Sequence, residues 1–182
     1  MKFNISDIDK ILSELLGISS LIVTDICEQQ FMEDASSMSL SKNQHYILKM
    51  LANAAPFNLS DLAGILSVSN AAIGKNIDKL VKYKLVTRKF STKDRRAAKI
   101  SITKEGIDIV EKHYKLKIEN HIEIFKHFSL EDKEKFTNYL RSFIRNTLHK
   151  NMNTDILCLQ CDGFCGDDCI VKEVNGTCIR EH

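Results

Sequence analysis

The fold of this chain is decided by residues 69–106, which read SNAAIGKNIDKLVKYKLVTRKFSTKDRRAAKISITKEG. Four apolar residues in the first part recur at helical spacing: Ile73, Ile77, Leu80 and Val81. They predict a helix over 70–83, with Ser69 as its N-cap. The spacing then changes to the alternation and β-branched content of two strands, 85–90 and 97–102, joined by a polar, positively charged loop. The stretch therefore predicts a basic helix followed directly by a β-hairpin.

The segments on either side of this stretch have helical spacing. A short helix over 59–66 and a tight turn precede the basic helix, so that the two form a helix-turn-helix pattern, and the hairpin that follows is a wing. Upstream, one long helix with a broad apolar stripe is expected over about 5–32, and another begins after Ser41. Two more helices are expected downstream, to about residue 128 and then to 148. The predicted fold class is mainly α with a small β-hairpin wing.

The composition is that of an ordinary folded protein in which charge is unevenly distributed. The 182 residues are 43% hydrophobic and 27% charged, with one Pro and seven Gly, which excludes a disordered chain, a collagen-like repeat and a Pro-rich scaffold. The formal net charge is only +2, but residues 70–105 carry eleven Lys and Arg against three acidic residues. Residues 151–182 carry two against six. A polyanion is therefore expected at the basic centre.

Several classes of protein are disfavoured by motifs that the sequence lacks. No stretch approaches the roughly 18–20 apolar residues that span a bilayer. The N-terminus turns acidic at Asp7 and has no apolar run before a small-residue cleavage site, so a cytoplasmic, reducing location without membrane contact is expected. The phosphate-binding glycine motifs, Gly-x-Ser-x-Gly and HExxH are missing, so no enzymatic activity is expected.

The order of these elements resembles the MarR family of winged-helix transcriptional regulators, and so does the string KDRRAAKISITKEG at residues 93–106. The resemblance covers about residues 8–150. It implies a homodimer whose first and last helices interlock, with two winged helix-turn-helix lobes that bind a pseudo-palindromic operator in double-stranded DNA. We expect a repressor, and the family's habit of binding phenolic ligands adds a small-molecule effector to the expected partners. The expected domains are an N-terminal dimerisation helix (1–38), the winged helix-turn-helix (39–104), C-terminal dimerisation helices (105–150) and a Cys-rich tail (151–182).

Ten residues of the basic helix and the loop are expected to contact DNA: Ser69, Asn70, Ala71, Ala72, Lys75, Asn76, Lys79, Lys93, Arg95 and Arg96. Short polar groups at the N-terminal part of the helix can reach base edges and phosphates in the major groove. Arg95 and Arg96 can enter the minor groove, where A·T-rich narrowing strengthens the negative potential. By resemblance to the family, Asp94 orients a wing arginine. A solvated charged face is the alternative interpretation of the basic residues taken alone.

Five of the six cysteines lie in the last 25 residues, at Cys158, Cys161, Cys165, Cys169 and Cys178. A CxxC pair lets two thiolates bind one ion from a tight turn, and the next two can close a tetrahedral zinc shell. The same spacing accepts an iron–sulfur cluster, so zinc and a cluster both stay open, as do a structural and a sensory role. A redox-inert thiol-rich tail, or fortuitous disulfides formed after lysis, is a further interpretation. Because an apolar core of its own is scarcely attainable there, a structural zinc site would order the tail by supplying its folding free energy. A thiol-based metal carrier or electron-transfer module on a degenerate DNA-binding fold is the alternative function, which loss of the basic residues would have favoured.

Other candidate ligands lie outside the tail. Cys27 is expected to be a half-buried packing thiol in the first helix, although peroxide-sensing members of the family use a cysteine near the N-terminus. Zinc-sensing members gather ligands near the second and fifth helices, and five residues occupy roughly that territory here: Glu28, His45, Glu111, His113 and His121. The match is incomplete, because Tyr46 follows His45 and the residues after His113 are not rich in His. A packed core is therefore favoured over a second metal site.

Overall fold

The computed structural model describes residues 7–54, 56–90, 98–148, 154–161 and 169–176. Along the chain the elements are α1 (Asp7–Leu21), η1 (Ile22–Cys27, a π-helical segment), α2 (Glu28–Ala35), α3 (Lys42–Asn53), β1 (Phe57–Asn58), α4 (Leu59–Ile65), α5 (Asn70–Lys82), β2 (Val86–Phe90), β3 (Ala98–Ile102), α6 (Lys104–Phe125), α7 (Leu130–Leu148), α8 (Thr154–Gln160) and α9 (Ile170–Asn175). The mainly helical fold with a small sheet confirms the predicted fold class. Within the described residues, no helix is both long and apolar enough to span a bilayer.

Ser41 and Ser69, where the sequence predicts that helices begin, are the N-caps of α3 and α5, and Thr103 is the N-cap of α6. Each of the three accepts a hydrogen bond from the backbone N–H three residues further on. Ser41 also forms a capping box, in which the Gln44 side chain accepts the N–H of the cap residue. Because each cap satisfies an N–H that the helix leaves without a partner, the starts of α3, α5 and α6 follow from local chemistry.

The sheet is antiparallel with strand order β1-β3-β2. The β2–β3 hairpin runs from the pair Val86–Ile102 to the pair Phe90–Ala98, as the alternation predicted. The third strand, β1, adds the pair Phe57–Ile100 and was not predicted, because two residues are too few to show a period. The loop of the wing, with Lys93, Asp94, Arg95 and Arg96, lies outside the described residues.

The main core lies between α3, α4, α5 and the sheet. Its fully buried aliphatic residues are Ile47, Leu48, Met50, Leu62, Ile73, Ile77, Leu80, Leu85 and Ile100. Ile73, Ile77 and Leu80 confirm most of the apolar face predicted for α5, whereas Val81, which the sequence also placed on that face, is 39% exposed because it lies near the C-terminal end of the helix, at the edge of this core. Full burial of such a side chain contributes about 1.5–3 kcal/mol, so this core holds α5 firmly on α3 and on the wing.

The N-terminal segment differs from the single helix that the sequence predicts. It is built from α1, η1 and α2 in succession, and the π-helical segment shifts the face that each helix presents. The apolar stripe on α1 is largely exposed within one chain, with Ile8 62% and Leu15 56% accessible. Only α2 contributes to the interior, through Phe31, Met32 and Ala35. The stripe of α1 is therefore no part of the chain's own core.

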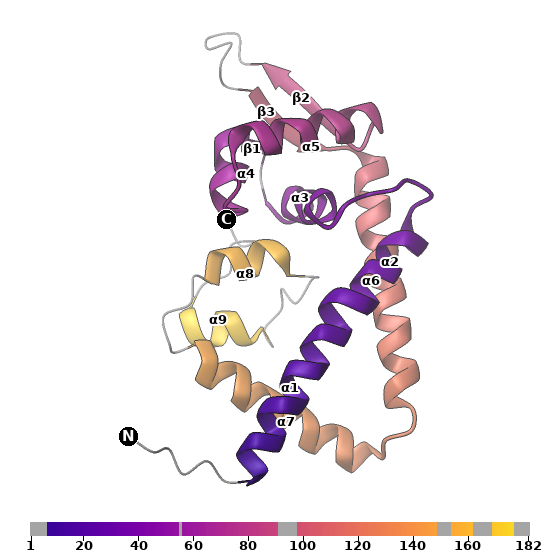
Figure 1. Cartoon of the computed structure of the whole chain (residues 1–182), viewed down its shortest axis with the longest axis vertical. Coiled ribbons are helices and arrows are strands. Elements are labelled where there is room, and N and C mark those ends of the chain that lie inside the picture. Colours follow the sequence, from indigo (N-terminus) through magenta and orange to yellow (C-terminus); the bar gives the residue numbers. More distant parts are fainter. Residues whose placement is uncertain (1–6, 55, 91–97, 149–153, 162–168, 177–182) are drawn as a thin grey trace.

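The two short helices near the C-terminus pack on the rest of the molecule. Figure 1 shows α8 beside α3, and α9 between α8 and the end of α7. Leu159 is 3% exposed and belongs to the main core. Cys158, Cys169 and Val171 form a smaller buried cluster with Leu148 of α7. The described part of the tail thus contributes Leu159 to the main core and forms a small apolar cluster of its own against the end of α7.

Candidate functional site

The first part of the candidate site is the outer face of α5, at the end of the molecule opposite α7 (Figure 1). The buried residues of α5 recur at helical spacing, which leaves Asn70, Ala71 and Lys75 on the exposed side, next to the exposed cap Ser69. The N-terminal end of a helix presents backbone N–H groups and a positive partial charge, which suit an anion. Four of the predicted DNA contacts therefore share one accessible surface.

Asn76 and Lys79 lie on the same helix, but their side chains form hydrogen bonds to other parts of the chain. The Gln44 side chain donates from Nε2 to Asn76 Oδ1 at 3.1 Å, and Asn76 Nδ2 donates to the backbone oxygen of Ala72 at 3.1 Å. Lys79 Nζ donates to the backbone oxygen of Ser39 at 2.9 Å. Both side chains are half-buried. In this structure they fix α5 against α3 and the segment before it.

The two strands of the hairpin bring together two cations that were not among the predicted DNA contacts. Lys89 on β2 and Lys99 on β3 are directly opposite in the register, and both are exposed. Like charges in this arrangement are destabilising, unless an anion lies against them. On the same strand, Arg88 Nη1 lies 3.2 Å from Asp78 Oδ1 of α5, a surface ion pair that joins helix and hairpin. The sequence predicted the two strands but not their register, and it is the register that brings the two lysines together.

A second cluster is buried between α2, α3 and α6. His113 Nε2 lies 2.9 Å from Glu28 Oε2, and the ring centroids of His45 and His113 are 4.1 Å apart. One potential ligand atom from each of these three residues lies within 4.8 Å of the others. Two imidazoles and a carboxylate are a donor set that fits zinc. Of the five residues that the sequence placed in this territory, the structure brings these three together.

Lys117 changes the electrostatics of this cluster. Its Nζ lies 2.8 Å from Glu28 Oε1, one helical turn after His113. Burial by itself raises the pKa of Glu28, but the hydrogen bonds from His113 and Lys117 outweigh it and hold that pKa well below its ordinary range. The cluster thus has the donors of a metal site together with a lysine that already neutralises its carboxylate.

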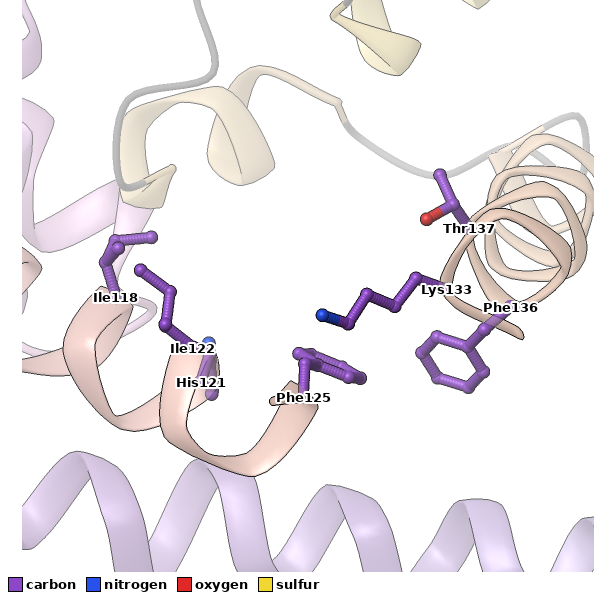
Figure 2. A pocket seen from close by; sticks show the side chains of 7 residues that line it. All are labelled: Ile118, His121, Ile122, Phe125, Lys133, Phe136 and Thr137. Carbon is purple, nitrogen blue, oxygen red and sulfur yellow. The ribbon is translucent and has the colours of Figure 1, made fainter. Parts of the chain in front are cut away.

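His121 and Glu111 lie apart from this cluster, each on a different cavity. Figure 2 shows the first cavity, about 360 Å³ in volume, between α6 and α7. Its lining is Ile118, His121, Ile122, Phe125, Lys133, Phe136 and Thr137. The second cavity, about 250 Å³, lies between α3 and α6, and Cys161 of the tail is on its wall with Lys49, Asn53, Glu111 and Tyr114.

The tail cysteines are placed only in part. Cys158 and Cys169 are buried in the cluster on α7, while Cys161 is half-buried and donates its backbone N–H to the oxygen of Cys158 at 3.2 Å. Cys165 and Cys178 lie outside the described residues. The thiols of the three described tail cysteines do not meet within the 4.8 Å that groups the Glu28 cluster. Outside the tail, Cys27 is half-buried at the end of η1, as predicted.

Comparison with known proteins gives matches of sequence and of fold. Residues 40–98 match the sequence model of the MarR family. The uncharacterised HTH-type transcriptional regulator YpoP of Bacillus subtilis is 36% identical over 72 residues, which are 40% of this chain and 51% of that protein. The chain thus spans about half the length of this curated relative.

Two solved structures illustrate the likeness of fold. RV1404 from Mycobacterium tuberculosis has a TM-score of 0.65 and 24% identity, over 79% of this chain and 97% of that one. A MepR mutant from S. aureus bound to an oligodeoxyribonucleotide has a TM-score of 0.57 and 18% identity, over 72% of this chain and 97% of that one. At these identities the structures show a shared fold.

Proposed function

The chain is a member of the MarR family through the winged helix-turn-helix domain of residues 40–98, and from this premise we propose that it is a transcriptional repressor. It binds a pseudo-palindromic operator in double-stranded DNA as a homodimer. One observation carries the proposal: Asn70, Ala71 and Lys75 of α5 are exposed beside a hairpin that bears the opposed pair Lys89 and Lys99. Such a surface places short polar groups for base edges and cations for phosphates.

Exposed apolar side chains on α1 and α7 support the homodimer. On α1 they include Ile8, Ile11, Leu12, Leu15, Leu16 and Ile18, and on α7 they include Phe136, Tyr139, Leu140 and Phe143. The cavity of Figure 2 continues this apolar surface between α6 and α7. Apolar surface on this scale marks an interaction site, and a second copy of the chain offers the same surface in return. A dimer would present two copies of α5 to successive major grooves.

The proposed partners include an ion or cluster in the tail and a small effector. Cys158, Cys161 and Cys169, with Cys165 and Cys178, provide thiolates for zinc or an iron–sulfur cluster, in a structural or sensory role. The cavity between α3 and α6 is the place for an effector, because Lys49 and Tyr114 give it a cation and a phenol.

Metal and acid-labile sulfide analysis of protein purified without oxygen distinguishes zinc from an iron–sulfur cluster in the tail. About one zinc per chain indicates a zinc site, and iron with sulfide indicates a cluster. Replacing Cys158 and Cys161 with Ser tests the sensory role, which fails if operator affinity and its metal response do not change.

DNA binding is tested by selecting duplexes from a randomised library and measuring affinity by fluorescence anisotropy at several salt concentrations. Arg95→Ala, Arg96→Ala and the Lys89→Ala/Lys99→Ala pair should weaken binding and make its salt dependence shallower, since each phosphate contact contributes about 0.9 to the logarithmic slope. Lys112→Ala on exposed α6 is the matched charge control and should change neither. Lys75→Ala should weaken binding to the selected duplex more than to a scrambled one. A wild-type protein without preference for any duplex would contradict the proposal and favour the metal-carrier alternative.

The homodimer and the direction of regulation need separate measurements. Leu15→Asp should dissociate the dimer in sedimentation experiments and weaken operator binding, because a charge would then lie in the apolar interface. A single-chain mass for the wild type would contradict the dimer. Transcription in vitro from a promoter that overlaps the selected operator should fall as the protein is added, and a rise would indicate an activator.

A further inference from the structure

We propose that α8 and α9 form a strap within one chain, which holds the DNA-binding domain in a fixed, binding-competent position relative to α7. The inference rests on the proposed DNA-binding function and concerns its regulation. It follows from three sets of contacts: one on α3, one on α7, and one that connects α3 to α5.

The strap is attached to the DNA-binding domain at the C-terminal end of α3. Asn53 Nδ2 donates to the backbone oxygen of Leu159 at 3.0 Å and to that of Cys161 at 2.8 Å. The Leu159 side chain is buried in the main core, beside the residues that hold α3, α4 and α5 together. Because one side-chain amide bonds two carbonyl groups at the C-terminal end of α8, it fixes both where and in what orientation that end of the helix lies on α3.

The strap is attached to α7 through α9. Arg141 Nη2 lies 3.3 Å from Glu173 Oε2, and the Arg145 guanidinium bonds the other oxygen of the same carboxylate. Under these ion pairs, Cys169 and Val171 are buried with Leu148. Cys158 of α8 belongs to this same cluster, whereas its neighbour Leu159 belongs to the main core. Consecutive residues of α8 therefore join the two parts of the molecule. Figure 1 shows α8 between α3 and α9.

Helix α3 carries the effect from the strap to the DNA-binding surface. Asn53 is at its C-terminal end, and Gln44, in its first turn, bonds Asn76 of α5. A helix of 12 residues is about 18 Å long and moves as one body, so a shift at Asn53 is passed on to α5. If α7 belongs to the dimer interface, the strap determines how far apart the two copies of α5 lie. That separation must match one turn of the DNA.

The thiols are placed to control this contact. Cys158 and Cys161 lie on either side of Leu159, and the oxygen of Cys161 is one of the two that Asn53 bonds. A bond or an ion at the Cys161 thiol would act on the residue whose backbone oxygen Asn53 bonds. This arrangement links the chemistry of the tail to operator affinity.

The test uses Asn53→Ala and Glu173→Lys, each of which loosens one end of the strap, in the full-length protein. Asn120→Ala, at an exposed position on α6, is the matched control. Hydrogen exchange measures opening of residues 154–160, and anisotropy with the selected duplex measures affinity. Each loosening variant should raise exchange in α8, leave exchange in α5 slow, and weaken duplex binding by about tenfold, as expected for the loss of one or two hydrogen bonds. The double variant should bind no more weakly than the weaker-binding single variant, because both changes release the same strap.

Several results would overturn the inference. Faster exchange in α8 with unchanged or tighter duplex binding would show that the strap opens without consequence for DNA. Fully additive losses in the double variant would show two independent effects. Unaltered exchange in both variants would show that these contacts do not hold the strap. Failure of the proposed function is distinct from these, since the wild type would then bind the selected duplex no better than the scrambled one.

Discussion

Replacing Gly106 with Ala should destabilise this protein, although the change favours a helix elsewhere. Gly106 lies in the first turn of α6, where its N–H is bonded to the cap Thr103. A Cβ added to it would lie 2.4 Å from the backbone oxygen of Leu85 and 2.7 Å from Ile102 Cγ1. The Leu85 oxygen cannot retreat freely, because it accepts the N–H of Thr103 at 3.0 Å.

The magnitude follows from two opposed contributions. Replacing a helical Gly with Ala stabilises by about 0.5–1 kcal/mol when the new methyl group meets open space. Overpacking against fixed neighbours costs about 1–3 kcal/mol. For Gly106 the second contribution should exceed the first and leave a net loss of roughly 1–2 kcal/mol. Gly74 in α5 and Gly64 in α4 have no atom within 4 Å of an added Cβ, so Ala at either position should raise stability.

Urea unfolding followed by circular dichroism measures these differences, at one protein concentration because the unfolding of a dimer depends on concentration. With a slope of about 1–3 kcal/mol per molar urea, a loss of roughly 1–2 kcal/mol should lower the midpoint of Gly106→Ala by roughly 0.3–2 M. Gly74→Ala should raise it. A Gly106→Ala protein as stable as the wild type, with an unchanged slope, would refute the close approach of α6 to the Leu85 carbonyl.

Three further predictions concern other parts of the molecule. Gln44→Ala removes a hydrogen-bond donor to Asn76 and half of a capping box, so the free energy of unfolding, measured by thermal denaturation, should fall by about 1–2 kcal/mol. Operator affinity should fall too, and unchanged affinity would show that the contact between α3 and α5 does not affect DNA binding. Glu28→Gln should remove an acid sensitivity. Because the folded-state pKa of Glu28 is depressed, its stabilisation is fully present above the ordinary pKa of 4.5 and is lost as the pH falls below it, so urea midpoints between about pH 6 and pH 3 should decline more steeply in the wild type. Ser69→Ala should cost about 1 kcal/mol and weaken duplex binding, since it removes the cap of α5; an unaltered midpoint would mean that water satisfies that N–H equally well.

Helical spacing did not predict the contacts in the candidate site that join residues distant in the sequence. Helical spacing correctly placed Lys75 on the open face of α5, but Asn76 and Lys79 are engaged by Gln44 and by the backbone of Ser39. Which exposed polar residue finds a partner depends on how α5 sits on α3, and no spacing within α5 contains that information. In the same way Glu28 and His113, 85 positions apart in the chain, meet only because α2 packs on α6.

By itself the sequence determined the starts of α3 and α5, and all of the inward face of α5 except Val81, because caps and helical spacing act over three or four residues. It also determined the hairpin, through an alternation that holds along each strand. Tertiary structure alone decided that the stripe of α1 stays uncovered within one chain, and that Leu159 of the tail enters the main core. An apolar face in a sequence indicates that burying it is favourable, but the hydrophobic effect is non-directional and does not specify the covering surface. Which segment covers the face is decided by how distant parts of the chain pack together.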